Sequence, residues 1–313
     1  MEIPREELHK IAPTPVYFLD ESPSPASPST PLNSTSNSSS HHGGSKKWVI
    51  PTLCKIQKYS AWGLVSFLGI HLTSVVVVPI LPISHDLKQQ VFSLAKAVYQ
   101  DVPLYEPVFI FGAGITHILS GIALRLVRYF KRRNQHRSAA RVQLLNAAID
   151  IKDSDDDIGL GGISNIFGLG YRKSITTTQF GLTPLQFSGY VSIPFVLFHI
   201  YKFRYMPWAV EGDSSLINLD YITYVLNLKH PWVNTVALLG LVLSVTYHVT
   251  IGGMKLQGFY SRNWKRAGLV MVNVLGFAGM VSIYMFKRSV NVDLHSADFV
   301  GKAFSKYINA FLL

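Results

Sequence analysis

The chain is poor in cysteine and in charge. Its 313 residues include a single cysteine, Cys54, which excludes an intrachain disulfide framework and a zinc site built from several cysteines. Only 15% of the residues are charged and 48% are apolar, whereas about 25% charged residues is usual in a soluble domain. The mean hydropathy is +0.24. These proportions exclude a chain that is disordered throughout, and they indicate that lipid surrounds much of the folded protein.

Acidic residues are also scarce, with 18 Asp and Glu against 29 Lys and Arg, so the net charge is +11. In a membrane protein such an excess usually marks loops on one side of the bilayer, and nucleic acid is therefore not the expected partner. The first ten residues contain three glutamates and no apolar run follows them. We therefore expect no secretory signal or Arg-rich transit peptide, and insertion directed by internal apolar segments.

Residues 1–47 form a Pro- and Ser-rich segment. Seven of the sixteen prolines lie within it, together with a Ser/Asn run at 34–40. Such a composition cannot bury an apolar core, so we expect a disordered arm.

The composition changes abruptly after this arm. Five apolar stretches are each about 20 residues long, the length that crosses a bilayer as a helix. The sequence thus predicts an all-α integral membrane protein in which residues 48–288 form a five-span bundle. A connecting loop is expected at 130–183 and an interfacial C-terminal segment at 289–313. The predicted spans are about 59–83, 106–129, 184–204, 232–254 and 265–286.

Basic residues flank these spans unevenly. They cluster before the first span, in the 130–183 loop and in the connection between the last two spans, whereas the opposite connections carry more acids. The positive-inside rule then places the arm and the 130–183 loop on the cytosolic side. With five spans, the C-terminal segment lies on the other side of the membrane.

Four of the eleven histidines fall inside predicted spans. Each of the first four spans contains one, namely His71, His117, His199 and His248. Ionisable residues within a membrane are costly, and they are therefore candidates for a function.

The sequence around these histidines repeats. Ser60 precedes His71 by eleven residues, and Ser188 precedes His199 by eleven. In the second and fourth spans, a glycine and then a basic residue follow the histidine at similar spacing. The first two helices therefore look duplicated as the third and fourth, which predicts two stacked histidine pairs. Such pairs suit bis-histidine ligation of haem, but they also suit hydrogen-bonded packing residues copied by duplication.

These features resemble two families. The four His-bearing helices and the Ser-to-His spacing resemble the cytochrome b membrane anchors of succinate dehydrogenase and fumarate reductase, over residues 56–287. That resemblance implies one or two haem b groups, held between His71 and His199 and between His117 and His248.

The arrangement of the whole chain resembles the fungal MDM-ten-complementing proteins. The resemblance rests on the Pro-rich arm before five spans and on Thr183-Pro-Leu-Gln186-x-Ser-Gly189 at the start of the third. It implies an adaptor in the mitochondrial outer membrane that recruits a bridge-like lipid-transfer protein of the vacuolar protein sorting-thirteen family. Contact between vacuole and mitochondrion and mitochondrial lipid homeostasis are the implied roles.

The arm carries a matching motif with prolines at alternate positions. Two such prolines favour an extended or polyproline conformation. The apolar residues around them offer anchors for a β-rich groove, in which backbone pairing gives affinity and side-chain pockets give specificity. The predicted docking residues are Leu8, Ile11, Pro13, Pro15 and Val16.

The sequence contains no constellation of nucleophile and base and no strong metal motif, so we expect no enzyme. Polar residues within the spans raise a further hypothesis, that the bundle passes phospholipid between leaflets. The alternative function is electron transfer through haem.

Overall fold

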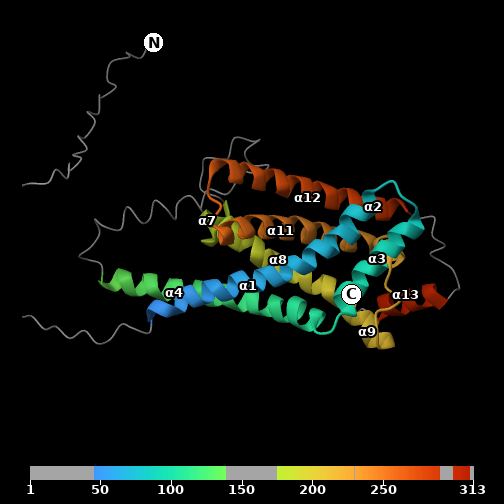
Figure 1. The fold of residues 1–313 in the computed structure, drawn as a ribbon, viewed down its shortest axis with the longest axis horizontal. Coiled ribbons are helices and arrows are strands. Elements are labelled where there is room, and N and C mark those ends of the chain that lie inside the picture. Colours follow the sequence, from blue (N-terminus) through green and yellow to red (C-terminus); the bar gives the residue numbers. More distant parts are fainter. Residues whose placement is uncertain (1–45, 139–174, 229, 290–298, 311–313) are drawn as a thin grey trace, which may run out of the picture. The chain divides into compact units, whose positions relative to one another are not determined.

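A computed structural model describes residues 46–138, 175–228, 230–289 and 299–310 (Figure 1). All of these residues belong to one unit, residues 44–313. Within the described ranges every regular element is helical, as the sequence predicts. The docking residues expected between Leu8 and Val16 lie outside the described residues.

The first two predicted spans are long helices. Helix α1 (Lys46–Leu72) continues through the π-helix η1 (Thr73–Val77) into α2 (Val78–Ile80). The second span combines the π-helix η2 (Tyr105–Gly112) with α4 (Ala113–Ser138). By length and composition, Trp48–Ile80 and Tyr105–Lys131 can cross a membrane.

The fourth and fifth predicted spans are α11 (Pro231–Gln257) and α12 (Arg262–Arg288), and both can also cross a membrane. Pro231 begins α11 at a position where the missing N–H costs nothing. Gly258 ends it with φ of 75°, a conformation that glycine adopts without strain. The described residues thus contain four helices that are long and apolar enough to span a bilayer.

The third predicted span is helical but is not among these four. It consists of α8 (Pro184–Ile200), the π-helix η3 (Tyr201–Tyr205) and α9 (Met206–Glu211). A capping box starts α8, because Thr183 Oγ1 accepts from the Gln186 N–H and Gln186 Oε1 accepts from the Thr183 N–H.

Four shorter helices lie in connections or near the C-terminal end: α3 (His85–Gln100), α7 (Ile175–Phe180), α10 (Leu219–Asn227) and α13 (Phe299–Asn309). Helix α3 occupies a stretch for which the sequence reasoning predicted no helix. The end of α4 and all of α7 lie within residues 130–183, where a loop was expected.

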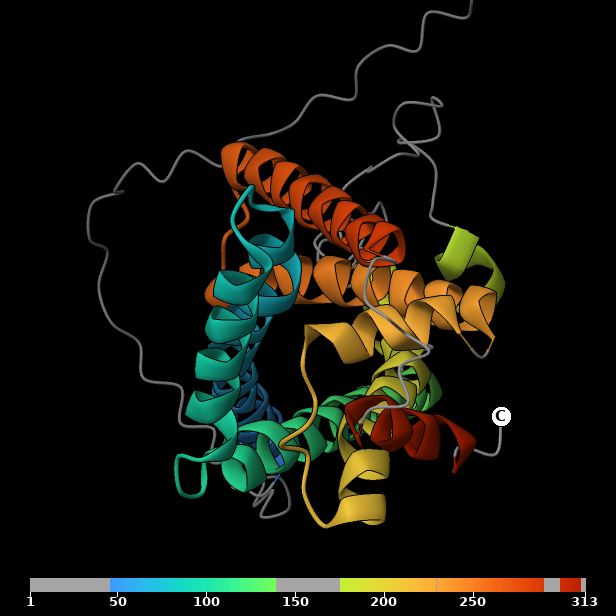
Figure 2. The ribbon, with the colours of Figure 1, turned by 90° about the vertical axis from the view of Figure 1, so that its right-hand side faces the viewer.

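The long helices pack in pairs. Helix α1 packs against α4, α8 packs against α11, and α12 lies on α11 and also contacts η1 and α2. In Figure 1 the start of α1, the end of α4, α7 and the α11–α12 connection lie at one end of this unit. Helices α3, α9 and α13 lie at the opposite end, which faces the viewer in Figure 2.

The buried apolar core gathers at this second end. It joins residues of α3, α10, α12 and α13 around Tyr221, which is fully buried. The apolar face of α13 belongs to this core and packs against α9 and α10. The helix expected to lie in the membrane interface therefore uses its apolar face within the protein. The α13 residues in the core are Ala303, Phe304, Tyr307 and Ile308.

Most of the surface of the candidate spans is not buried inside the protein. Between 11 and 28% of the most apolar window of each candidate span is buried inside the protein. Large apolar side chains such as Leu119, Val274 and Phe277 are exposed. Surfaces of this kind are stable in hydrocarbon and would be costly in water.

Candidate functional site

The first histidine pair joins α1 to α8. The ring centroids of His71 and His199 are 5.8 Å apart, with an angle of 70° between the ring planes. Phe67 stacks on His71, and Phe203 lies against His199. The Nδ1 atoms of both histidines are buried and find no hydrogen-bond partner among the described residues. Two imidazoles therefore face one another in an apolar surrounding.

Tyr99 of α3 closes one side of this pair. Its ring lies edge-on to His71 and to Phe67. Burial raises the pKa of Tyr99 to about 12, an effect that the carboxylate of Glu106 reinforces. The hydroxyl therefore stays protonated at neutral pH.

The second pair joins α4 to α11. The ring centroids of His117 and His248 are 6.1 Å apart, with an interplanar angle of 83°. Each Nδ1 lies 3.3 Å from a backbone carbonyl oxygen, that of Gln57 for His117 and that of Leu185 for His248. Because a carbonyl only accepts, each Nδ1 carries the proton in these contacts, and each Nε2 keeps its lone pair.

The segment around His71 matches the segment around His199 in the spacing of its residues along the chain. Gln57 precedes His71 by 14 residues, and Leu185 precedes His199 by 14. A π-helix begins two residues after each of these histidines, and a proline follows eight residues after each. π-Helical turns inside α-helices are frequent at functional sites. These equal spacings extend the repeat around Ser60 and Ser188 to further positions, which were not used to recognise it.

The residues present suit a haem group. Two imidazoles that both ligate one metal through nitrogens about 2 Å away place their ring centroids about 6 Å apart. A ligating histidine usually donates its other ring N–H to a carbonyl, as His117 and His248 do here. Among the described residues, no three His, Cys, Asp or Glu side chains gather into a metal site of their own.

Gly189 lies directly against the second pair. A Cβ built at this position would stand 2.7 Å from Cε1 of His248. The absence of a side chain therefore lets α8 approach the His248 ring.

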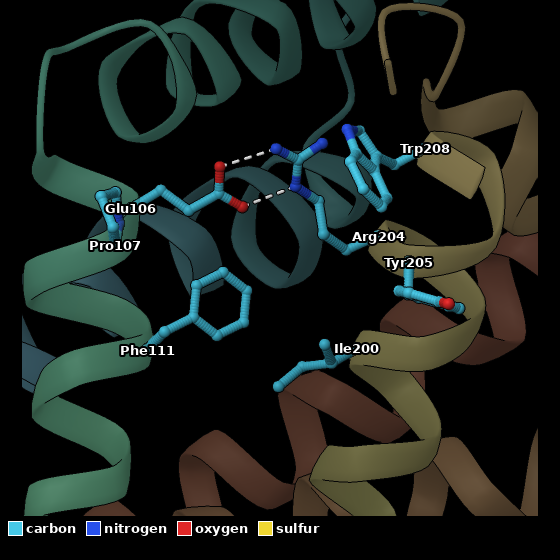
Figure 3. Close-up of a pocket in the computed structure, with 7 residues that line it drawn as sticks. All are labelled: Glu106, Pro107, Phe111, Ile200, Arg204, Tyr205 and Trp208. Atoms are coloured by element: carbon cyan, nitrogen blue, oxygen red, sulfur yellow. Dashed lines mark hydrogen bonds and ion pairs between the residues drawn. The ribbon is translucent and has the colours of Figure 1, made fainter. Parts of the chain in front are cut away.

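A charged cavity lies between the start of η2 and the segment from α8 to α9 (Figure 3). Arg204 donates to both carboxylate oxygens of Glu106, at 2.5 and 2.7 Å, and also to Ser214 Oγ at 2.7 Å. In the sequence, Glu106 marks only the start of the second predicted span, and Arg204 was not predicted as a functional residue. The sequence shows a charged residue at the end of each of these two apolar segments, but the pairing of two residues 98 positions apart leaves no local pattern.

The family model described as "MDM10-complementing protein 1, transmembrane domain" matches residues 66–177 and 194–289. Each matched segment contains one histidine of each pair. The chain is 28% identical over 188 residues to the "Mitochondrial adapter protein MCP1" of Saccharomyces cerevisiae. That alignment covers 58% of this chain and 58% of the yeast protein's length. No solved structure matches the chain significantly. Because the matched segments make up more than half of its length, the chain belongs to the MDM10-complementing protein 1 family.

Proposed function

We propose that this protein is an adaptor in the mitochondrial outer membrane, with the helical bundle as its anchor and residues 1–47 as its docking arm. The observation that carries the proposal is the similarity to the yeast mitochondrial adapter protein. The four helices long enough to span a bilayer support the role of anchor. The protein recruits a bridge-like lipid-transfer protein of the vacuolar protein sorting-thirteen family, and so supports vacuole–mitochondrion contact and mitochondrial lipid homeostasis.

The arrangement of charges supports a cytosolic arm. The start of α1, the end of α4 and the α11–α12 connection lie at the same end of the bundle, and all three carry basic residues (Figure 1). Basic flanks stay on the cytosolic side during insertion. In this proposal α8 is the fifth crossing, because it runs beside α11 between the same two ends. The C-terminus then lies in the intermembrane space.

The docking proposal is tested by replacing Pro13 and Pro15 together with alanine in the full chain. The matched control is the double replacement of Pro23 and Pro25, which lie in the same arm without the apolar spacing of the motif. The expected result is loss of the fluorescent partner from mitochondria in the first variant only. If both variants recruit the partner as well as the unmodified protein, the docking motif is wrong.

We further propose that the bundle passes phospholipid between leaflets. Polar side chains within the spans support this role, since they lower the cost of moving a headgroup past the helices. Two of them, Ser120 and Thr246, are buried, whereas Asn273 is exposed on the surface of α12. The full set is Ser66, Thr73, Thr116, Ser120, Thr246 and Asn273. An unchanged dithionite-accessible lipid fraction in liposomes that contain the protein would refute this role.

Haem b binding for electron transfer is the second candidate function, and the two close histidine pairs favour it. His71 with His199 and His117 with His248 would hold the group, which would supply one-electron chemistry. The test is the absorption spectrum of the purified protein, oxidised and reduced. A b-type spectrum that is lost in part on His117→Ala or His71→Ala supports this function. A featureless spectrum would leave the histidines as packing residues.

A further inference from the structure

The cavity at Glu106 and Arg204 differs in kind from the histidine pairs. Its volume is about 290 Å³, and apolar or aromatic side chains provide most of its lining. Several of them are exposed, so the cavity lies at the surface of the protein (Figure 3). A volume near 300 Å³ is at the small end of the range of ligand sites, which suits a headgroup rather than a whole lipid. The lining residues are Glu106, Pro107, Phe111, Ile200, Arg204, Tyr205 and Trp208.

The ion pair at this cavity is held in a defined orientation. The side chains of Glu106 and Arg204 are 15% and 30% exposed, and both carboxylate oxygens accept from the guanidinium. Ser214 accepts a further hydrogen bond from Arg204 and donates to Gln100. The cavity therefore presents one positive and one negative group side by side, with no net charge.

The position of the Glu106–Arg204 ion pair along its helices indicates that this ion pair lies in the headgroup layer of the membrane. The second candidate span begins at Tyr105, one residue before Glu106. Tyr201, Tyr205 and Trp208 expose their rings on the neighbouring segment. Tyrosine and tryptophan gather at membrane–water interfaces, where an apolar ring and a polar tip both find suitable surroundings. The cavity thus lies where lipid headgroups would reach it.

We propose that this cavity binds the headgroup of a zwitterionic glycerophospholipid, with its phosphate on Arg204 and its ammonium on Glu106. The exchange replaces one ion pair by two and leaves no charge unpaired. A headgroup with only negative charge would place its phosphate near Glu106 without a cation to compensate. The rings of Tyr205 and Trp208 offer a cation–π surface to the ammonium, and Phe111 and Ile200 contact the start of the acyl chains.

The test uses the full chain in detergent micelles with a trace of phosphatidylethanolamine that carries a photoreactive group next to its headgroup. Peptide mapping should find the label on residues 105–111 and 200–208. Unlabelled phosphatidylethanolamine and phosphatidylcholine should compete about fivefold better than phosphatidylglycerol, as expected for one partly exposed charge interaction. Labelling spread evenly over all spans, or equal competition by phosphatidylglycerol, would overturn the proposal.

Two variants separate binding from a structural role of the ion pair. Ile200→Trp adds bulk to the cavity and leaves both charged residues in place, and it should lower labelling about fivefold, whereas Leu197→Trp, at an exposed position of the same helix outside the lining, should not. Glu106→Gln removes the carboxylate that pairs with Arg204 in the cavity and should reverse the ranking of competitors in favour of phosphatidylglycerol. An unchanged ranking would contradict the role of Glu106. None of these readouts depends on the docking arm, so the two proposals can fail separately.

Discussion

Lys96 of α3 anchors the segment that leads into α10, and its replacement should destabilise the end of the bundle that contains α3, α9 and α13. Its Nζ donates to the carbonyl oxygens of Ser214, Ser215 and Ile217, at 3.1, 2.8 and 3.0 Å. Ser214 and Ile217 are buried, whereas Ser215 is exposed and its carbonyl can regain water. Hydrogen bonds from a charged donor contribute about 1.5–3 kcal/mol each, so at the lower value, which suits the half-buried Lys96, losing two costs about 3 kcal/mol.

The perturbation is Lys96→Met, which keeps the apolar stem and removes the donor. At about 2–4 °C for each kcal/mol, the thermal midpoint should fall by about 6–12 °C. Intrinsic tyrosine and tryptophan fluorescence during heating in detergent measures this shift. The matched control is Lys88→Met on the same helix, where Nζ donates to the carbonyl of Pro79 at 2.9 Å. Equal shifts for the two variants would refute the reasoning.

Two further predictions concern a close contact between helices and a buried hydrogen bond, and the same thermal melting experiment measures both. Gly240→Ala on α11 should lower stability by about 1–3 kcal/mol, because the new Cβ would overlap the ring of Phe195. Gly253→Ala on the same helix meets no atom within 4 Å and should be neutral or stabilising, so equal loss in both variants would contradict the packing argument. Asn234→Ala removes the acceptor 2.6 Å from the buried Lys202 Nζ and should cost about 3 kcal/mol. Asn234→Asp keeps an acceptor and should lose less, and full stability of the alanine variant would show that the contact is dispensable.

The long helices could be predicted from the sequence because each apolar run matches the thickness of a bilayer. Their ends were harder to predict, since α1 begins at Lys46 rather than near residue 59. Lys46, Lys47, Lys55 and Lys58 interrupt the apolar pattern in the first turns of that helix, and Pro51 lies in its second turn, where proline removes a backbone hydrogen bond. The hydropathy pattern therefore indicates a later start.

The histidine pairing could be inferred from the repeat, because equal spacing to Ser60 and Ser188 places His71 and His199 at equal depth. The contacts of His117 with Gln57 and of His248 with Leu185 needed the structure, since backbone acceptors carry no side-chain signature.

Helix α3 and the core around Tyr221 were also missed. Their apolar residues are spread over short segments that are distant in sequence, and only tertiary packing brings those segments together.

The claim that the arm docks a partner while the bundle anchors it is tested most directly by moving the arm. Residues 1–47 are fused to an unrelated anchor of the mitochondrial outer membrane, in cells that lack their own adaptor. The fraction of the fluorescent lipid-transfer protein on mitochondria is then measured. We predict recruitment by the fusion, and its loss when Pro13 and Pro15 are replaced by alanine. Recruitment by the full chain but not by the fusion would contradict the account, because the docking surface would then lie on the bundle.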